Sequence, residues 1–291
     1  MEAFKFILPA LALLFVWVQW IEPHWLRFRK VTVHVKKPLP RPLRILHLSD
    51  LHTTKHHFHL DAFFNRLGAM DLNLDFVFVT GDLIDAESGI APCVANLKKI
   101  QSRLGTYVVL GNHDYRNYHS LRVWRHLFTK TDSYTFRAES QRNRLKEQLS
   151  KASAKVLFNE SLRIALGNGK EMTLVGLDDP VSRRANIPRA FSDVRSANLS
   201  IALTHSPVTF PTLAEHKIDL AFAGHTHGGQ IRVPGMGPLA RLLSHVSPII
   251  DSTAEFGFHG VVSRGMGAKA GVRMRLFCRP EAVLVQVEGA P

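Results

Sequence analysis

The chain has 291 residues, of which 45% are hydrophobic and 21% charged, and this composition excludes a chain that is disordered throughout. Lys and Arg number 37 against 24 Asp and Glu, and the formal net charge of +13 favours anionic partners such as nucleic acid, anionic lipid headgroups or phosphate-bearing substrates. The only two cysteines, Cys93 and Cys278, form no C-x-x-C pair, so they exclude a disulfide framework and a cysteine zinc site and are expected to be buried hydrophobic residues.

The N-terminal segment is predicted to be a membrane anchor. The apolar run from Phe6 to Val18 contains no charged residue, and Trp20 and Trp25 can extend it at the membrane interface. A cleaved signal peptide is the alternative interpretation, but the run is preceded by a weakly basic segment and followed by no convincing A-x-A cleavage site. We therefore expect an uncleaved anchor helix within residues 1–26.

A basic segment follows the anchor, and residues 27–43 are expected to form a juxtamembrane linker. Residues 24–44 contain seven Lys or Arg and no acidic residue. The positive-inside rule therefore places this end of the anchor, and the rest of the chain, on the cytoplasmic side of the inner (cytoplasmic) membrane. The same side chains can bind anionic headgroups, at ~1 kcal/mol per residue close to the surface. No obligate protein partner is evident.

From residue 44 onward, short apolar runs alternate with helix-like segments, as in βαβ units. Helices are expected at roughly 59–70 and 90–103. Strands are expected at 44–49, 76–80, 106–110, 172–177, 200–204, 219–223, 260–265, 273–277 and 282–287. Residues 44–291 are therefore predicted to form one α/β domain.

Residues of the metal-ligand type follow five of these strands. Because ligands of open α/β sheets bind beyond the carboxyl ends of the strands, the five loops should converge. A single D-x-H or H-x-H is a weak signal, but five such elements in order are a strong one. Asp50 and His52 are two residues apart, as are His225 and His227, and in an extended segment the side chains of such a pair point to the same side. The glycines around 224–230 would give the turn at His225 and His227 space. The residues are Asp50, His52, Asp82, Asn112, His113, His205, His225 and His227.

These motifs resemble the calcineurin-like metallophosphoesterases. The family pattern D-x-H, G-D-x-x-D, G-N-H-D, H and G-H-x-H is found as DLH (50–52), GDLID (81–85), GNHD (111–114), THSP (204–207) and GHTHGGQ (224–230). The resemblance covers about residues 43–288, and the closing VSRGMGAKAGVRMRLFCRPE is similar to a subgroup of membrane-associated bacterial phosphohydrolases. It implies a four-layer α/β/β/α sandwich with two metal ions at the sheet ends.

The resemblance also implies a ligand set. Asp50, His52 and His227 would hold the first divalent ion, Asn112, His205 and His225 would hold the second, and Asp82 would bridge both. Oxygen and imidazole ligands without thiolates suit Mn²⁺, with Fe or Mg²⁺ as alternatives. Two ions ~3.5–4 Å apart activate a water molecule for attack at phosphorus, so no protein nucleophile is required.

The residues after Asn112 are expected to assist the reaction. His113 is the candidate general acid for the leaving oxygen. Asp114 is expected to orient His113 or to contact substrate, and Arg116 is expected to contact phosphate. The three histidines of the segment 56–59 could form a third metal cluster, although a solvated loop near the site is the favoured interpretation. These histidines are His56, His57 and His59.

Residues 116–155 form a basic insertion with ten Lys or Arg against three acidic residues. Within it, the segment 121–128 places Leu121, Trp124 and Phe128 on one helical face and Arg122 and Arg125 elsewhere. Such a helix can lie in a membrane interface, where its arginines contact the phosphate of a substrate, or it can pack its apolar face on the core. The sequence leaves both possibilities open.

The anchor, the cytoplasmic domain and the basic insertion together favour a phosphate-bearing lipid substrate. Within the resembling subgroup, the activity that fits best is hydrolysis of UDP-2,3-diacylglucosamine to UMP and 2,3-diacylglucosamine 1-phosphate in lipid A biosynthesis. One alternative is a phosphodiesterase or nuclease that acts on nucleotides or nucleic acid, which suits the positive charge but lacks a recognisable nucleic-acid module. The other is a non-catalytic metal-binding scaffold, which would be expected to lack ligands that are present here.

Overall fold

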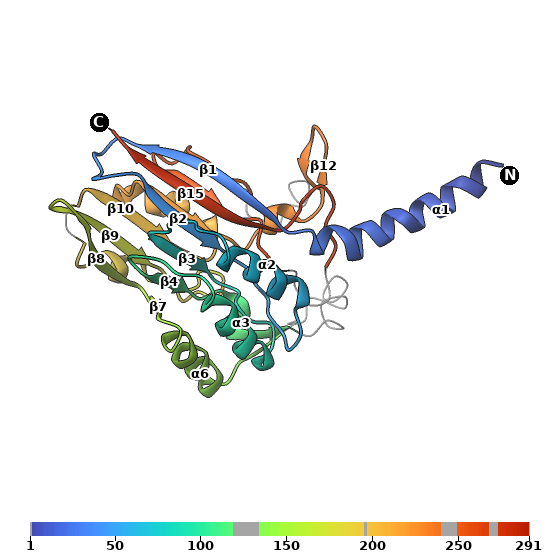
Figure 1. Ribbon diagram of the computed structural model, residues 1–291, viewed down its shortest axis with the longest axis horizontal. Coiled ribbons are helices and arrows are strands. Elements are labelled where there is room, and N and C mark those ends of the chain that lie inside the picture. The colour runs from blue at the N-terminus through green and yellow to red at the C-terminus, as the bar shows by residue number, and fades with distance from the viewer. Residues whose placement is uncertain (1, 119–133, 195–196, 240–248, 268–272, 291) are drawn as a thin grey trace.

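Two β-sheets form the centre of the body (Figure 1). The computed structural model describes residues 2–118, 134–194, 197–239, 249–267 and 273–290. The six-stranded sheet has the order β1 (Arg27–Val35), β15 (Glu281–Gly289), β2 (Leu43–Leu48), β3 (Phe76–Thr80), β4 (Thr106–Val109) and β7 (Ala154–Val156). The five-stranded sheet has the order β14 (His259–Val262), β11 (Leu220–Ala223), β10 (Leu199–Leu203), β9 (Lys170–Gly176) and β8 (Glu160–Gly167).

Most neighbouring strands are parallel, and this brings the loops of the predicted site to one edge. Strands β2, β3, β4 and β7 run parallel in the first sheet, as do β9, β10, β11 and β14 in the second. At the other side of the first sheet, β15 runs antiparallel to β2, and β1 runs parallel to β15.

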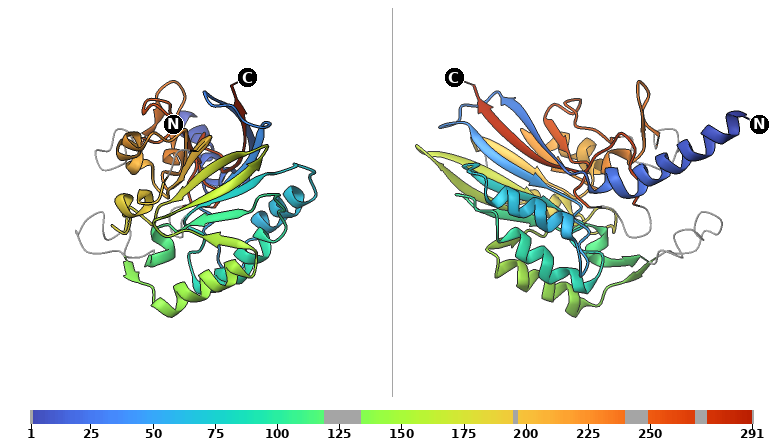
Figure 2. Two further views of the ribbon diagram at one scale, coloured as in Figure 1. Left: turned by 90° about the vertical axis from the view of Figure 1, so that its left-hand side faces the viewer. Right: turned by 45° about the vertical axis from the view of Figure 1, so that its right-hand side comes forward.

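Alternating side chains divide the core into layers. Phe78 of β3 lies between the two sheets, whereas its neighbour Val77 faces the helices α2 (Phe58–Gly68), α3 (Ile90–Leu97) and α6 (Glu139–Ser150). The short helices α7 (Ile187–Phe191) and α8 (Phe210–Leu213) cover the outer face of the second sheet. Figure 2 shows these layers in two further views. The predicted four-layer α/β/β/α sandwich is confirmed.

Several single turns and short strands complete the described chain. The strand β5 (Arg116–Tyr118) pairs antiparallel with β6 (Tyr134–Phe136), and β12 (Arg232–Val233) pairs with β13 (Gly237–Pro238). The remaining helical turns are α4 (Asn112–Tyr115), η3 (Glu87–Gly89), η4 (Pro207–Thr209), η5 (Ala214–His216) and η6 (His227–Gly229).

An apolar N-terminal helix extends away from the body (Figure 1). It consists of α1 (Glu2–Val16), the π-helical turn η1 (Trp17–Ile21) and the 3₁₀ turn η2 (Glu22–His24). Residues 6–24 are long and apolar enough to cross a membrane, and their large side chains, such as Phe6 and Leu13, are exposed. This helix could therefore anchor the chain to a membrane.

The prediction of a linker over residues 27–43 is wrong for its first nine residues. These residues form β1, which pairs with β15 from Arg27 opposite Glu281 to Val35 opposite Gly289. The valines at alternate positions, including Val33 and Val35, pack into the core between the sheets. The body therefore begins at the end of the N-terminal helix.

Two other predicted elements differ from the structure. The helix expected at 90–103 ends at Leu97, because the N–H groups of Arg103 and Leu104 bond to carbonyls near the start of β3 instead. The segment 273–277 alternates like a strand but forms no strand, and Leu276 makes a single bridge to Ile231. Its Arg275 is fully buried and donates to backbone carbonyls, so this segment is an irregular loop.

The remaining predicted strands form with small shifts of their ends, and β8 was not predicted. The described part of the insertion 116–155 contains β5, β6, α6 and β7. Its amphipathic segment 121–128, with Arg122 and Arg125, lies outside the described residues. An interfacial helix there stays a prediction.

Candidate metal centre

The seven predicted ligands come together at one edge of the sheets, and nearly all are buried. Asp50 and His52 follow β2, Asp82 follows β3, and Asn112 follows β4. The other three ligands follow β10 and β11. The Asp and His side chains of this set form two adjacent groups of possible ligands. Asn112 lies beside the second group, next to His205. The ligands from the second sheet are His205, His225 and His227.

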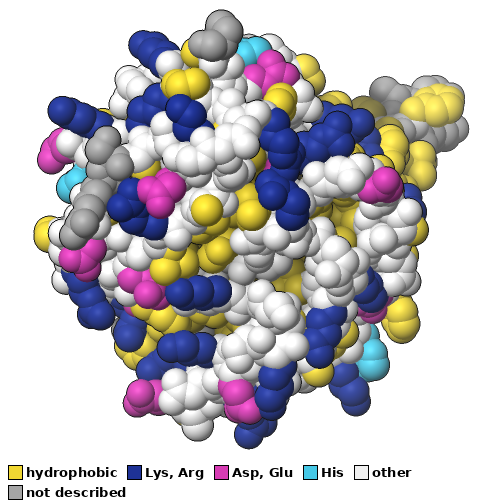
Figure 3. All heavy atoms as spheres, turned by 60° about the vertical axis from the view of Figure 1, so that its left-hand side comes forward, with side chains coloured by type: hydrophobic (Ala, Val, Ile, Leu, Met, Phe, Trp, Pro, Cys, Tyr) yellow, Lys and Arg dark blue, Asp and Glu magenta, His cyan; other side chains and the backbone are white. Residues whose placement is uncertain are grey.

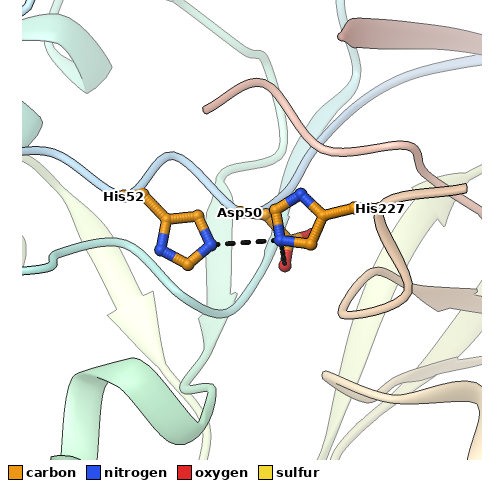
Figure 4. A group of neighbouring side chains, drawn as sticks. All are labelled: Asp50, His52 and His227. Atoms are coloured by element: carbon orange, nitrogen blue, oxygen red, sulfur yellow. Dashed lines mark hydrogen bonds and ion pairs between the residues drawn. The ribbon is translucent and has the colours of Figure 1, made fainter. Parts of the chain in front are cut away.

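The first group contains Asp50, His52 and His227 (Figure 4). The Nε2 atoms of His52 and His227 are 3.2 Å apart, and the Nε2 atom of His227 is 3.4 Å from Oδ1 of Asp50. Such imidazole nitrogens and carboxylate oxygens are ligands of first-row divalent ions. The family resemblance implied the same group of three.

The second group contains Asp82, His205 and His225, with Asn112 beside it. Nε2 of His205 lies 3.2 Å from Nδ1 of His225, 3.2 Å from Oδ1 of Asn112 and 3.4 Å from Oδ1 of Asp82. The other carboxylate oxygen of Asp82 is 3.7 Å from Nε2 of His52 in the first group. The two oxygens of Asp82 therefore face the two groups, as a bridging ligand requires.

Contacts behind the ligands orient two of the imidazoles. Nδ1 of His52 bonds to Oδ1 of Asp85 at 2.8 Å, and Nδ1 of His205 bonds to the Thr80 carbonyl at 2.8 Å. A hydrogen on each Nδ1 leaves the Nε2 lone pair directed toward the site, which is the tautomer that a metal ligand needs. The residues present thus fit a pair of divalent ions.

The sequence analysis assumed an extended backbone for these loops, and the structure shows a different conformation. Asp50 and His52 have φ values of 51° and 47°, and His225 and His227 have φ values of 67° and 49°. Asp82 has a φ of 52°. Asp and His adopt this left-handed conformation more readily than most residues, but it still costs roughly 1–2 kcal/mol each. The ligands are therefore held by strained turns directly after the strands.

Glycine is required at two positions beside the ligands. A Cβ atom on Gly224 would lie 1.8 Å from Oγ of Ser49 and 2.3 Å from Oδ2 of Asp50. Gly81 has a φ of 84°, and a Cβ atom on it would lie 2.5 Å from Nδ1 of His205. These contacts agree with the expectation that glycine gives the loops space to close.

Charges inside the site favour bound cations. Burial alone would raise the pKa of Asp82, but the imidazoles of His205 and His113 hold that pKa well below its usual range. Burial alone would lower the pKa of His205, but Asp82 and Asp50 raise it well above its usual value. The buried carboxylates thus stabilise positive charge placed between them.

His113 lies beside the first group, in the turn α4. It is almost fully buried, its ring centroid is 4.5 Å from that of His52, and its Nδ1 bonds to Oδ1 of Asp85 at 2.7 Å. Asp85 therefore orients both His52 and His113. Asp85 is the second aspartate of the GDLID motif, so the motif itself marked a functional residue that the sequence reasoning did not name.

Asp114, which was expected to orient His113 or to contact substrate, bonds to backbone groups of the loops. Its Oδ1 accepts the N–H groups of Leu83 and Ile84 at 2.9 and 3.2 Å, and its Oδ2 accepts that of Gly111 at 2.9 Å. Burial and the nearby Asp82 raise its pKa to about 7. Because Asp114 has no exposed surface, it fixes the loops around the site instead of contacting substrate or His113.

Two arginines of the insertion lie close to these loops. Arg137 is 3% exposed, and it donates to the carbonyls of His113 at 2.9 Å and Asp85 at 2.7 Å. No motif distinguished Arg137 from the other basic residues. Arg116 lies with its guanidinium carbon 5.7 Å from the ring of Phe136, and its contact with phosphate stays a prediction.

The histidines at 56–59 do not form a metal group among the described residues. With His24 and Arg273 they line a separate cavity of about 360 Å³. The prediction that these histidines lie in a solvated loop is correct for His56, which is exposed, but not for His57, which is buried. Burial also lowers the pKa of His59 to about 4, so its imidazole is neutral at pH 7.

Comparison with known proteins gives the family. The model of the family "Calcineurin-like phosphoesterase" matches residues 43–229. The metallophosphoesterase YkoQ of Bacillus subtilis is 28% identical, with 88% of each chain covered. The UDP-2,3-diacylglucosamine pyrophosphatase LpxG of Chlamydia trachomatis is 26% identical, with 95% of this chain and 93% of that protein covered. The phosphodiesterase YaeI of Escherichia coli is 27% identical, with 94% and 92% covered.

The matched residues include every motif of the two ligand groups and make up more than half of the chain. This chain therefore belongs to the calcineurin-like phosphoesterase family, which uses a dinuclear metal site, and it is a phosphoester hydrolase.

Proposed function

We propose that this chain hydrolyses a pyrophosphate or phosphodiester bond in a membrane lipid, with UDP-2,3-diacylglucosamine as the substrate. The products would be UMP and 2,3-diacylglucosamine 1-phosphate, in lipid A biosynthesis. One observation carries the proposal: the apolar helix joins the body at the same edge as the metal-ligand loops.

The strand register gives this position. The first residue of β1, Arg27, lies opposite Glu281 at the start of β15. Strand β15 runs antiparallel to β2, so that Val283 lies opposite His47 near the end of β2. Asp50 follows only three residues after His47 in the chain. A membrane that contains the helix would therefore lie on the side of the body where the site is.

The relatives support a phosphorus–oxygen bond as the target. The name of LpxG gives UDP-2,3-diacylglucosamine as the substrate of a relative that matches nearly the whole chain. The name of YaeI gives only a phosphodiesterase, which keeps soluble nucleotides and nucleic acid as the alternative substrates. The helix at the edge of the site favours the lipid, because a soluble substrate gains nothing from it.

The described residues on the face of the body that is turned away from the N-terminal helix give no sign of a duplex-binding surface. On the face shown in Figure 3, Lys and Arg side chains are interspersed with Asp and Glu and form no continuous basic strip. A duplex-binding surface requires clustered cations along the phosphate backbone. We also propose that the body lies on the cytoplasmic side of the inner membrane, and the basic residues that follow the apolar segment support this orientation.

We assign the two ligand groups to two ions, with Mn²⁺ preferred and Fe or Mg²⁺ as alternatives. Asp50, His52 and His227 would hold one ion, and Asp82 would contact both. Bound ions of this kind supply an activated water and neutralise charge at phosphorus. The other ion would be held by Asn112, His205 and His225.

The protein's own acid would be His113. Its Nδ1 bonds to Asp85, which leaves Nε2 to carry a proton to the leaving oxygen. Burial lowers the pKa of His113, while Asp82 and Asp85 oppose that effect. An anionic phosphate beside the ring would raise this pKa, which would favour the protonated imidazole when substrate is bound. Arg137 would hold the carbonyls of His113 and Asp85 in place.

The proposal is tested with the purified full-length protein in detergent and Mn²⁺. UDP-2,3-diacylglucosamine, a cyclic nucleotide and single-stranded DNA are incubated separately, and the products are identified by mass spectrometry. We expect UMP from the lipid, at a rate well above that of Asp82→Ala. Release of UMP no faster than with this variant would reject the lipid substrate, and cleavage of the nucleotide or DNA alone would support the alternative.

A further inference from the structure

A second cavity lies where the N-terminal helix meets the body. It has a volume of about 470 Å³, and its apolar lining includes Leu14, Trp17, Trp25 and Phe277. Glu22 also lines it, but both carboxylate oxygens of Glu22 already accept hydrogen bonds, from the Trp17 indole and the Cys278 N–H. We call this cavity the junction pocket. Its volume is in the range of small-molecule sites. It is separate from the two ligand groups.

The wall of the junction pocket is unusually apolar for an exposed surface. The rings of Trp17 and Trp25 meet edge to face, with centroids 5.8 Å apart. Trp25 is 50% exposed and Phe277 is 59% exposed. Phe277 also has a φ of 53°, which is rare for a bulky residue and costs roughly 1–2 kcal/mol. A strained backbone that keeps a phenyl ring at the pocket rim indicates an apolar ligand.

Arginines border the same pocket. The guanidinium of Arg27 is paired with Glu281, at 2.5 Å. Among the described residues no carboxylate forms an ion pair with the side chains of Arg264 or Arg279, and Arg279 instead lies 3.8 Å from the ring centroid of Trp25. Two guanidinium groups at the edge of an apolar pocket can bind the phosphate of an amphipathic molecule.

The two ends of the pocket meet the membrane segment and the metal centre. Leu14 and Trp17 belong to the segment 6–24 that could cross a membrane. Arg264 is followed by Gly265, and a Cβ atom on Gly265 would lie 2.9 Å from Cβ of Asp50 and 3.1 Å from Nδ1 of His227. A lipid in this pocket would thus have its acyl chain near the membrane and its phosphate on the side of the ligands.

We propose that the junction pocket binds an acyl chain of the phosphate-bearing lipid substrate, and that Arg264 and Arg279 contact its phosphate as the lipid leaves the bilayer. This inference rests on the proposed function. The charge of the arginines, the apolar wall and the continuity with the membrane segment select an anionic lipid as the occupant.

Binding is tested on the full chain in phosphatidylcholine nanodiscs. The probe is phosphatidic acid with a photoactivatable group in its acyl chain, present at low mole fraction, and labelled peptides are mapped by mass spectrometry. We expect labelling around residues 14–25 and 276–279, and roughly tenfold less with Arg264→Gln/Arg279→Gln, since two charge-assisted contacts are lost. The double variant Arg163→Gln/Arg189→Gln, which removes two arginines elsewhere, serves as the control and should label like the wild type.

The second variant, Phe277→Asp, places a negative charge at the rim and should lower labelling to a similar extent. Thermal melting and bound-metal content show that each variant is folded. Labelling that is spread evenly over residues 6–24, or that neither pocket variant lowers, would overturn the inference and indicate general membrane contact only.

A kinetic arm separates this inference from the proposed function. If both hold, Arg264→Gln/Arg279→Gln should raise KM for UDP-2,3-diacylglucosamine about tenfold with little change in kcat. Specific labelling of the pocket without hydrolysis of this lipid by the wild type would reject the proposed substrate and keep the pocket as an anionic-lipid site. Hydrolysis with unchanged KM in the variant would keep the function and reject the pocket.

Discussion

Two regions meet at the same edge of the sheets, and they are built in different ways. In the ligand loops, the candidate metal ligands lie in short motifs of neighbouring residues, such as the pair Asp50 and His52. At the junction of helix and body, the contacts join distant residues: Oε1 of the buried Glu22 accepts the N–H of Cys278 at 2.5 Å. Local motifs therefore predict the site, whereas the contacts of the junction join residues that are far apart in the sequence and cannot be predicted from a local motif.

The two regions are also connected. The thiol of Cys278 donates to the carbonyl of His227 at 3.3 Å, so the residue that contacts Glu22 also supports the ligand loop. Burial raises the pKa of this thiol, which keeps it protonated. Because Cys278 contacts both the helix junction and the loop of His227, mutations on each side are needed to test the two regions separately.

The change with the largest expected effect is Asp82→Ala. Because its two oxygens face the two ligand groups, its loss should lower kcat/KM by roughly 10³-fold or more and lower the bound metal per chain. Steady-state kinetics and elemental analysis measure both. Asp71→Ala, at an exposed position, is the control. Retention of two bound ions by Asp82→Ala would contradict the bridging role.

The change His113→Ala tests whether His113 acts as the general acid or as a metal ligand. The loss of a general acid should lower kcat by ~10²-fold or more, while the bound metal stays the same. The companion Asp85→Asn should also weaken metal binding by ~10–100-fold, since Asp85 orients His52 as well. Metal loss in His113→Ala would instead make His113 a ligand.

The change Glu22→Ala tests the junction. It removes the acceptor of the buried Cys278 N–H and of the partly exposed Trp17 indole N–H. Leaving the Cys278 N–H without a partner should lower the free energy of unfolding by ~1–3 kcal/mol. Thermal melting in detergent measures this loss, with the exposed Glu215→Ala as the control. We expect bound metal to be unchanged, and an unaltered melting temperature would show that the contact adds no stability.

The last expected effect is a pH dependence of stability that comes from His47, near the end of β2. Burial and the nearby Arg29 lower its pKa from 6.5 to about 3. Between these pH values the unfolded chain binds a proton here and the folded chain does not, so stability falls as the pH decreases, by up to ~1.4 kcal/mol per pH unit.

Urea unfolding at several pH values between 7 and 4 measures the slope. His47→Gln should make the slope shallower, whereas the exposed His34→Gln should not. Equal slopes for His47→Gln and the wild type would show that His47 titrates normally in the folded chain.

The sequence predicted the seven candidate ligands because their residue types lie in short local motifs. The family resemblance implied the grouping of Asp50 with His52 and His227, and the structure brings these three side chains together. Their strained turns were not predictable, since a left-handed φ at Asp or His leaves no mark in the pattern. The choice between Asp85 and Asp114 as the partner of His113 likewise required the fold, because both belong to matching motifs.

The junction was predicted poorly for a physical reason. Arg27 and Arg29 gave the start of β1 the appearance of a basic linker, yet both arginines pair with the buried Glu281, far along the chain. At 273–277 the alternating pattern suggested a strand, but the buried Arg275 bonds to loop carbonyls instead. The partner of Arg27 lies 254 residues along the chain, so no local sequence window contains it.

Anomalous scattering from Mn²⁺-soaked crystals tests the central claim most directly. We predict two peaks, one among Asp50, His52 and His227 and the other among Asn112, His205 and His225, with Asp82 in contact with both. A single peak, or none at these side chains under saturating Mn²⁺ or Fe²⁺, would contradict a dinuclear centre in this chain.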